Sequence, residues 1–217
     1  MLWTRGPDAF IVMEHVEIDH PASDEQRARA LTELATIKPP PNANLGPIGG
    51  GLVKHSFFSY PECASDVKYT SIGQLDRHIN QVRLFSRTSA IKAWPTDQPV
   101  FFLVQVLRAY NMPNRELFQV NLAQERLVCY YSDLSRNNFP VDDNNQLWVV
   151  DFDHAGVLPV SFMALALRIP LEDPVPWQYA RDIPIERTEN LKGLRRASWW
   201  FKIGCSIFRK YPVFLTE

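Results

Sequence analysis

Three polar residues in the middle of the chain have the types and the order that phosphoryl transfer uses. Asp133 is followed five positions later by Asn138, and Asp151 comes after a turn signal and an apolar run. Phosphoryl transfer needs one carboxylate beside the attacking hydroxyl, and an amide oxygen with a second carboxylate to hold Mg²⁺ against the phosphates. The sequence therefore contains one candidate set of groups for this chemistry.

Two short strands are expected to position this set. Residues 127–131 and 147–152 are rich in apolar and β-favouring side chains, and residues 142–145, Asp-Asp-Asn-Asn, give a turn signal between them. A hairpin formed by these strands would return Asp151 to the loop that carries Asp133 and Asn138.

Helices are expected around this hairpin. Ser23 and Gln26 have the spacing of a capping box, and prolines 39–41 end the helix that follows. Ser71 precedes a second helical pattern, Pro159 opens a third that runs to residue 167, and a fourth covers residues 186–208. The apolar faces expected on the first two are Ala28, Leu31, Leu34, Ala35 and Ile37, and then Ile72, Leu75, Ile79 and Val82. The predicted fold is α+β and mostly α.

The composition of the chain limits the classes of function that we expect. The chain has 217 residues with 46% hydrophobic, enough for one domain with a core, and 23 basic against 24 acidic residues argue against a nucleic-acid partner. No apolar run approaches the roughly 18 residues that a membrane span needs, and no signal peptide is indicated. Three widely spaced cysteines favour a reducing compartment, so the expected location is cytoplasmic.

The motif residues resemble the aminoglycoside phosphotransferase and choline kinase family of the protein-kinase-like superfamily. Ser132-Asp133 and Asn138 match its catalytic loop, H-G/S-D-x-x-x-x-N. Residues 150–159, VDFDHAGVLP, match its metal motif, I/V-D-F/W-x-x-A-G-x-x-P, and residues 10–17 are similar to its hinge strand. The likeness is to fungal members, and it covers essentially the whole chain as a C-terminal lobe only.

The resemblance implies a remnant of the hinge strand over residues 1–18 and a kinase-like large lobe over residues 19–217, helical at residues 100–107. It implies Asp133 as the catalytic, hydroxyl-orienting carboxylate and Asn138 with Asp151 as Mg²⁺ ligands. The backbone of Glu14 and Val16 would face the adenine of ATP. The implied partners are a nucleotide and a small-molecule acceptor whose hydroxyl receives the phosphoryl group.

Two departures from the family affect the expected activity. Tyr131 stands where the catalytic loop usually has His, and the residues before the hinge hold neither a lysine nor a glycine-rich loop. Gly49-Gly50-Gly51 follows the hinge and opens no helix at a strand end. We therefore expect transfer to be impaired in this chain as it stands. The alternatives are a non-catalytic, pseudokinase-like binding or scaffold protein with a protein partner, and a truncated gene product.

Other patterns in the sequence indicate alternative sites less strongly. Asp151-Phe152-Asp153 also fits the D-x-D metal motif of glycosyltransferases, but the expected strands are too few for their fold. His154 beside two aspartates suggests a metal hydrolase or, more simply, a polar loop. Cys129 is expected to be a buried structural thiol. A basic cluster on the last helix predicts a solvated face or an anionic partner; it comprises Arg187, Lys192, Arg195, Arg196 and Lys202.

Overall fold

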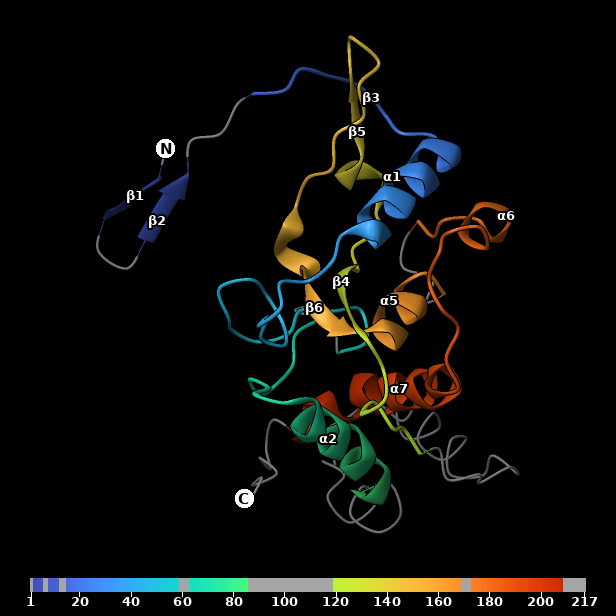
Figure 1. Ribbon diagram of the computed structural model, residues 1–217. Helices are drawn as coiled ribbons and strands as arrows, with labels where there is room; N and C mark the ends of the chain where they lie inside the picture. The colour runs from blue at the N-terminus through green and yellow to red at the C-terminus, as the bar shows by residue number, and fades with distance from the viewer. Residues whose placement is uncertain are drawn as a thin grey trace.

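The computed structural model describes residues 2–5, 8–11, 15–58, 63–85, 119–168 and 173–208. This part of the chain contains five α-helices and three two-stranded antiparallel sheets (Figure 1). The predicted class, α+β with more helix than strand, is confirmed for these residues. None of the helices in the described ranges is both long and apolar enough to cross a lipid bilayer.

The central hairpin pairs β4 (Leu127–Tyr131) with β6 (Ala155–Pro159). Its register runs from Leu127 opposite Pro159 to Tyr131 opposite Ala155, so both ends of the excursion between the strands are fixed together. The strand predicted at residues 127–131 is confirmed.

The second predicted strand, residues 147–152, is wrong. Only Leu147 makes a bridge, to Val141, and β6 lies further along the chain. Residues 156–159 are buried whereas Val150 is 39% exposed, so the later apolar run gains more by covering β4. The backbone N–H of Val150 instead bonds to the Asn138 carbonyl oxygen at 3.0 Å.

The other two sheets contain the three N-terminal strands and one strand from the segment between β4 and β6. β1 (Leu2–Arg5) pairs with β2 (Asp8–Ile11), and β3 (Ile18–Pro21) pairs with β5 (Pro140–Asp142). Of the segment 10–17 that is similar to the hinge strand, residues 10 and 11 belong to β2, residues 12–14 lie outside the described ranges, and residues 15–17 have no regular secondary structure. The expected turn after β5 is confirmed, with the Asn145 N–H bonded to the Asp142 carbonyl oxygen.

Helix α1 (Asp24–Thr36) begins as predicted. The Ser23 hydroxyl accepts a hydrogen bond from the Gln26 N–H, and the Gln26 side chain accepts one from the Ser23 N–H. Leu31 is fully buried, but Ile37 is 51% exposed because the helix ends at Thr36 and Ile37 is its C-cap. The capping box therefore predicts the start of this helix correctly, whereas the predicted buried face extends one residue beyond its end.

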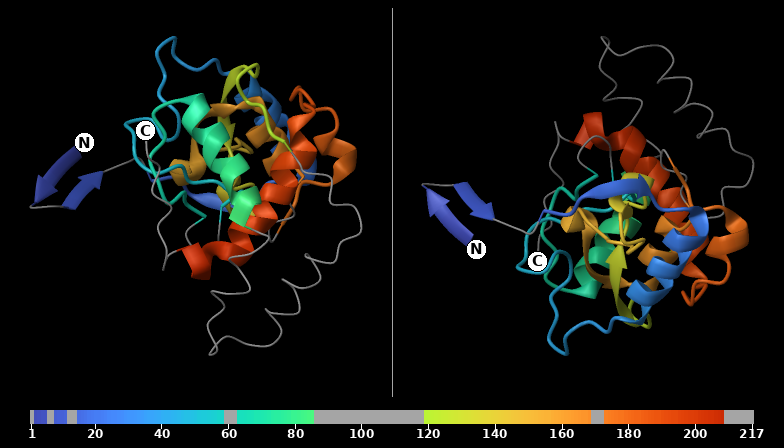
Figure 2. Two further views of the ribbon diagram at one scale, coloured as in Figure 1. Left: turned by 90° about the horizontal axis from the view of Figure 1, so that it is seen from below. Right: turned by 90° about the horizontal axis from the view of Figure 1, so that it is seen from above.

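Four further helices pack around the hairpin. They are α2 (Ile72–Phe85), α5 (Val160–Ala166), α6 (Trp177–Ala180) and α7 (Asn190–Phe208). Helix α5 contacts β4 and α7, and α7 crosses α2, as Figure 2 shows from below. The predicted starts of α2 and α5 are confirmed, whereas α7 begins four residues later than expected. The helix expected at residues 100–107 lies outside the described residues.

An aromatic cluster fills the core behind β4. The ring centroids of Phe57 and Phe162 lie 5.3 Å apart, and Phe201 from α7 lies 5.1 Å from Phe57. The Tyr130 hydroxyl of β4 donates to the Lys54 carbonyl oxygen at 2.9 Å. The segment before Phe57 is therefore tied to the rear of the hairpin.

Candidate functional site

The three motif residues lie at one end of the β4–β6 hairpin. Asp133 comes two residues after β4 ends, and Asp151 comes four residues before β6 begins. Tyr131, the last residue of β4, is opposite Ala155, the first of β6. The pairing brings the two segments that carry the aspartates to the same end of the sheet.

The electrostatics of Tyr131 place both aspartates near one side chain. Burial raises the pKa of the Tyr131 hydroxyl, and the negative charges of Asp133 and Asp151 raise this pKa further. The Asn138 side chain opposes these effects as a hydrogen-bond partner. The two segments are also joined directly, because the Val150 N–H bonds to the Asn138 carbonyl oxygen at 3.0 Å.

Asp133 and Asn138 belong to one tight loop. Asp133 Oδ1 accepts a hydrogen bond from the Ser135 N–H at 3.2 Å, and Asn138 Nδ2 donates to the Asp133 carbonyl oxygen at 3.2 Å. Asn138 ends the 3₁₀ turn η1 (Arg136–Asn138) and is 8% exposed. Because Nδ2 is engaged within the loop, Oδ1 is the atom of Asn138 suited to a cation.

Asp151 has an unusual backbone. Its φ of 56° and ψ of 67° lie in the left-handed region, which costs free energy for a residue other than glycine. The exposed side chain accepts a hydrogen bond from the Asp153 N–H at 3.4 Å and caps the 3₁₀ turn η2 (Phe152–His154). Strained conformations of this kind are concentrated at functional sites, so the backbone supports a role for Asp151 beyond capping.

Two arginines that the sequence analysis missed anchor the Asp133 loop to α1. Arg27 is fully buried, and its Nη1 donates to the Leu134 carbonyl oxygen at 2.8 Å. Arg136 donates to Asp24 at 2.9 Å and to Asp173 at 3.2 Å. The only local signal was that Arg27 lies on the same helix face as Leu31. An arginine in a helix normally indicates a solvated residue, so this signal was not sufficient.

A glycine-rich loop packs against the other side of the site. Gly46 and Val157 of β6 exchange two backbone hydrogen bonds, each 2.9 Å long. A Cβ atom at Gly156 would overlap the Gly46 carbonyl oxygen, so only glycine permits this approach. This contact gives the glycine of the 150–159 motif a structural reason.

Lys54, which follows the glycine loop, forms an ion pair with Asp153. Both side chains are partly exposed, at 38% and 58%, so the ion pair itself contributes little stability. It does place a cation beside the segment that carries Asp151. The sequence analysis did not identify Lys54, because the pairing joins segments far apart in the chain.

The remaining predicted residues are placed as follows. Glu14 lies outside the described residues, and Val16 is half-buried in a segment without regular secondary structure. Nδ1 of His154 is buried and has no hydrogen-bond partner among the described residues. Burial raises the pKa of the half-buried Cys129 thiol, which suits a structural thiol better than a nucleophile.

No group of three or more His, Cys, Asp or Glu side chains in the described ranges is arranged to hold a metal ion. The predicted set contains two carboxylates and one amide, so it is not a group of that kind.

No protein-family model matches this chain, and no curated protein sequence matches it. The functional assignment therefore depends on the motif residues and on the geometry around Tyr131.

Proposed function

We propose that this chain is a kinase-like lobe that binds Mg²⁺ and orients a small-molecule hydroxyl for phosphoryl transfer from ATP. The observation that carries the proposal is geometric: the β4–β6 pairing and the bond from the Val150 N–H to the Asn138 carbonyl oxygen bring the segments of Asp133, Asn138 and Asp151 together. A carboxylate for the hydroxyl and two oxygen ligands for the metal then lie at one end of the β4–β6 hairpin.

The donor set fits Mg²⁺. Asn138 offers an amide oxygen from a rigid, buried position, and Asp151 offers a carboxylate from an exposed one. Mg²⁺ keeps several water ligands and needs only one or two carboxylates from the protein. When bound, the ion would supply charge neutralisation for the phosphate oxygens.

Asp133 suits the role of orienting the acceptor. One carboxylate oxygen is held by the Ser135 N–H, which fixes the plane of the group. The second oxygen is suited to accept a hydrogen bond from an alcohol. A carboxylate so placed keeps the hydroxyl in position and can take up its proton.

Lys54 offers part of the positive charge that a separate small lobe would supply. Lys54 forms its ion pair with Asp153 at a partly exposed position and not in the interior of the protein. Exchange of this carboxylate for a phosphate oxygen would therefore cost little, since exposed ion pairs contribute at most about 1 kcal/mol.

A second candidate is a binding protein that holds metal and nucleotide without transfer. It is favoured by the irregular backbone of residues 15–17, where the nucleotide-facing strand was expected.

Titration with Mn²⁺, monitored by electron paramagnetic resonance, tests the metal site. We expect Asp151→Asn and Asn138→Ala each to weaken Mn²⁺ binding about tenfold, as expected for loss of one ligand. Asp143→Asn, in the exposed turn, is the matched control and should bind as wild type. Equal affinity for wild type and Asp151→Asn would contradict the proposal.

Transfer of the γ-phosphate from ATP to a panel of alcohols separates the two candidates. The enzyme predicts transfer that Asp133→Asn abolishes while Mn²⁺ binding stays intact. Metal-dependent ATP binding with no transfer to any alcohol would favour the binding protein.

A further inference from the structure

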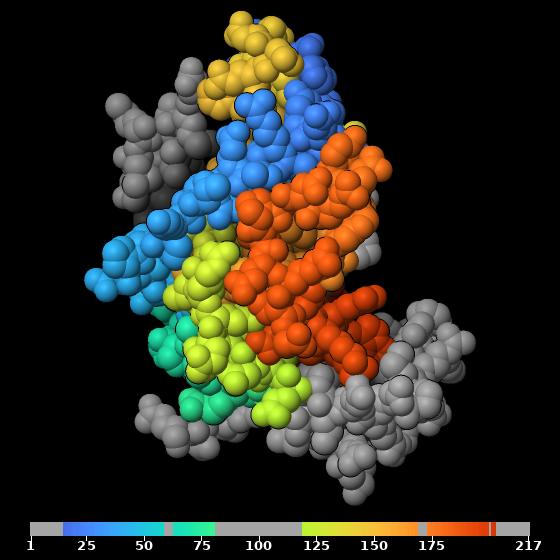
Figure 3. Space-filling model, turned by 45° about the vertical axis from the view of Figure 1, so that its right-hand side comes forward, coloured from blue at the N-terminus to red at the C-terminus, as the bar shows by residue number. Residues whose placement is uncertain are grey.

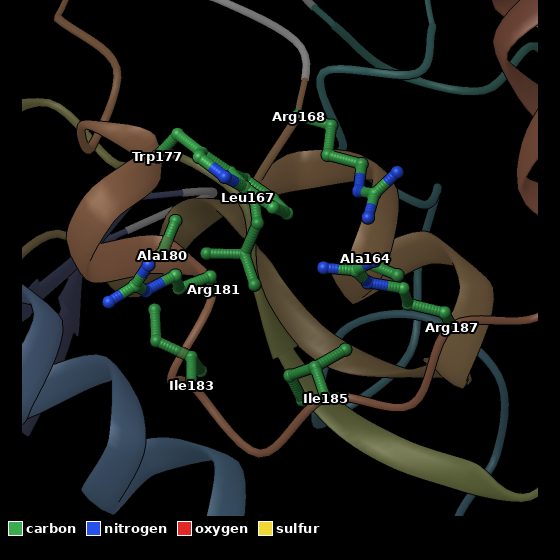
Figure 4. Close-up of a pocket in the computed structure, with 9 residues that line it drawn as sticks. All are labelled: Ala164, Leu167, Arg168, Trp177, Ala180, Arg181, Ile183, Ile185 and Arg187. Atoms are coloured by element: carbon green, nitrogen blue, oxygen red, sulfur yellow. The ribbon is translucent and has the colours of Figure 1, made fainter.

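A hollow with a basic rim lies between the end of α5, helix α6 and residues 181–187 (Figure 4). It shares no residue with the site around Tyr131. Its cavity volume is about 30 Å³, so it is a small surface hollow, and Leu167, Ile183 and Ile185 provide apolar walls. Figure 3 shows the segment that contains α6 on the surface below α1.

Three arginines surround this hollow. The guanidinium carbons of Arg168 and Arg187 lie 5.5 Å and 5.0 Å from the ring centroid of Trp177, so two cations share one indole. Arg181 lies on the opposite side of the hollow from Arg168 and Arg187 (Figure 4). Trp177 is 55% exposed, which is high for a large aromatic side chain.

In the part of the chain that the structure describes, two of the three arginines have no carboxylate partner. Among the described residues, no carboxylate forms an ion pair with Arg168 or Arg187. Glu186, next to Arg187 in sequence, pairs with Arg126 at 3.7 Å. Arg181 forms an ion pair with its neighbour Asp182 at 3.5 Å, and because both side chains are mostly exposed this pair contributes little. Three like charges around one hollow repel one another unless an anion joins them.

We propose that this hollow binds a phosphate monoester that carries an apolar or aromatic group. Guanidinium groups match phosphate oxygens through paired hydrogen bonds, and three of them favour a dianion over a single carboxylate. The apolar walls and the Trp177 ring would contact the carbon part of the ligand. Of the basic cluster noted in the sequence, only Arg187 takes part.

Calorimetric titration with phenyl phosphate at low ionic strength tests the proposal. Inorganic phosphate tests binding of the anion without a ring. Benzoate tests a singly charged anion on the same ring, and phenol tests the ring without the anion. We expect phenyl phosphate to bind about tenfold more tightly than either inorganic phosphate or benzoate, and phenol not to bind. Arg168→Gln and Arg187→Gln should each weaken phenyl phosphate binding about tenfold, the effect of losing a hydrogen bond to a charged group.

Matched variants distinguish this site from general attraction and from the Tyr131 site. Arg195→Gln removes an exposed charge from α7 and should leave binding unchanged, as should Asp151→Asn. Trp177→Leu should weaken phenyl phosphate more than inorganic phosphate. The proposal is overturned if Arg168→Gln with Arg187→Gln binds as wild type, if Arg195→Gln has the same effect as either, or if Asp151→Asn abolishes binding. Equal affinity for benzoate and phenyl phosphate would overturn the preference for a phosphate.

Discussion

The Tyr131 hydroxyl donates a 2.6 Å hydrogen bond to the carbonyl oxygen of Val150, the residue that precedes Asp151. The last side chain of β4 therefore holds the backbone of the segment that carries the candidate metal ligand. Tyr131 stands where the resembling family has His. In this chain the residue offers a direct link between the strand and the segment that carries Asp151.

Tyr131→Phe removes this link while keeping the ring. We expect the free energy of unfolding to fall by about 1 kcal/mol, because one mostly buried hydrogen bond is lost. We also expect weaker Mn²⁺ binding, since Asp151 loses its support. Urea unfolding and Mn²⁺ titration measure the two effects. A loss of stability with unchanged Mn²⁺ affinity would show that the bond does not position Asp151.

Arg27→Met tests the anchor of the Asp133 loop. The variant leaves the carbonyl oxygen of Leu134 and the carboxylate of Asp24 without their buried donor. Asp24 is partly exposed and keeps Arg136 as a partner, so the cost comes mainly from the Leu134 carbonyl oxygen losing a charged donor, about 1.5–3 kcal/mol. Arg29→Met on the same helix is the control; its side chain is 82% exposed, so its effect should stay within about 0.5 kcal/mol. Similar unfolding midpoints in urea for the two variants would contradict the role given to Arg27.

Gly156→Ala tests the contact between the glycine loop and β6. The added methyl group would overlap the Gly46 carbonyl oxygen, so the backbone must shift and the free energy of unfolding should fall by about 2–3 kcal/mol. Gly73→Ala is the matched control, because a Cβ atom there meets open space within α2. That substitution should stabilise the protein by about 0.5–1 kcal/mol. Chemical denaturation compares the two; a stabilised Gly156→Ala variant would show that the loop is not packed this closely.

Acid should destabilise the fold through His55. Burial lowers the pKa of His55 from 6.5 to about 3, and the neutral ring accepts from the Phe57 N–H and bonds to the Phe162 carbonyl oxygen. Between these pH values the unfolded chain binds a proton that the folded chain does not. The His55 contribution therefore decreases as pH falls through 6.5, by about 1.4 kcal/mol per pH unit. Burial lowers the pKa of His78 as well, so that residue acts in the same direction.

Unfolding free energies measured between about pH 7.5 and pH 5 check this slope. The His55→Gln variant should lose less stability per pH unit than the wild type, whatever its stability at neutral pH. The same slope in both proteins would contradict the assignment to His55.

The sequence predicted best those features that short-range interactions determine. The Ser23–Gln26 capping box and the β4 strand depend on neighbouring residues, and both are confirmed. The strand predicted to pair with β4 was wrong. Two apolar runs follow β4, at residues 147–152 and at β6, and only burial in the folded chain decides which of them pairs with it.

The motif predicted Asp133, Asn138 and Asp151, and the structure brings their segments to one end of the β4–β6 hairpin, whereas their roles stay predictions. The residues that support these segments were not predicted. Arg27 and Lys54 were missed, because an arginine or a lysine in a sequence indicates a solvated residue until its distant partner is known. Such long-range pairs leave no local pattern.

The pairing of Tyr131 with Ala155 has a consequence for synthesis of the protein. Asp133 leaves the ribosome well before β6 does, and before β6 is made the Asp151 segment can be held near the Asp133 loop only by isolated bonds, such as those that join Val150 to Asn138 and to Tyr131. Closing the intervening segment costs chain entropy, and the β4–β6 ladder with the packing of β6 adds most of the contacts that offset it. A nascent chain that stops before Ala155 would therefore contain both aspartates and the asparagine without the sheet that fixes them at one end.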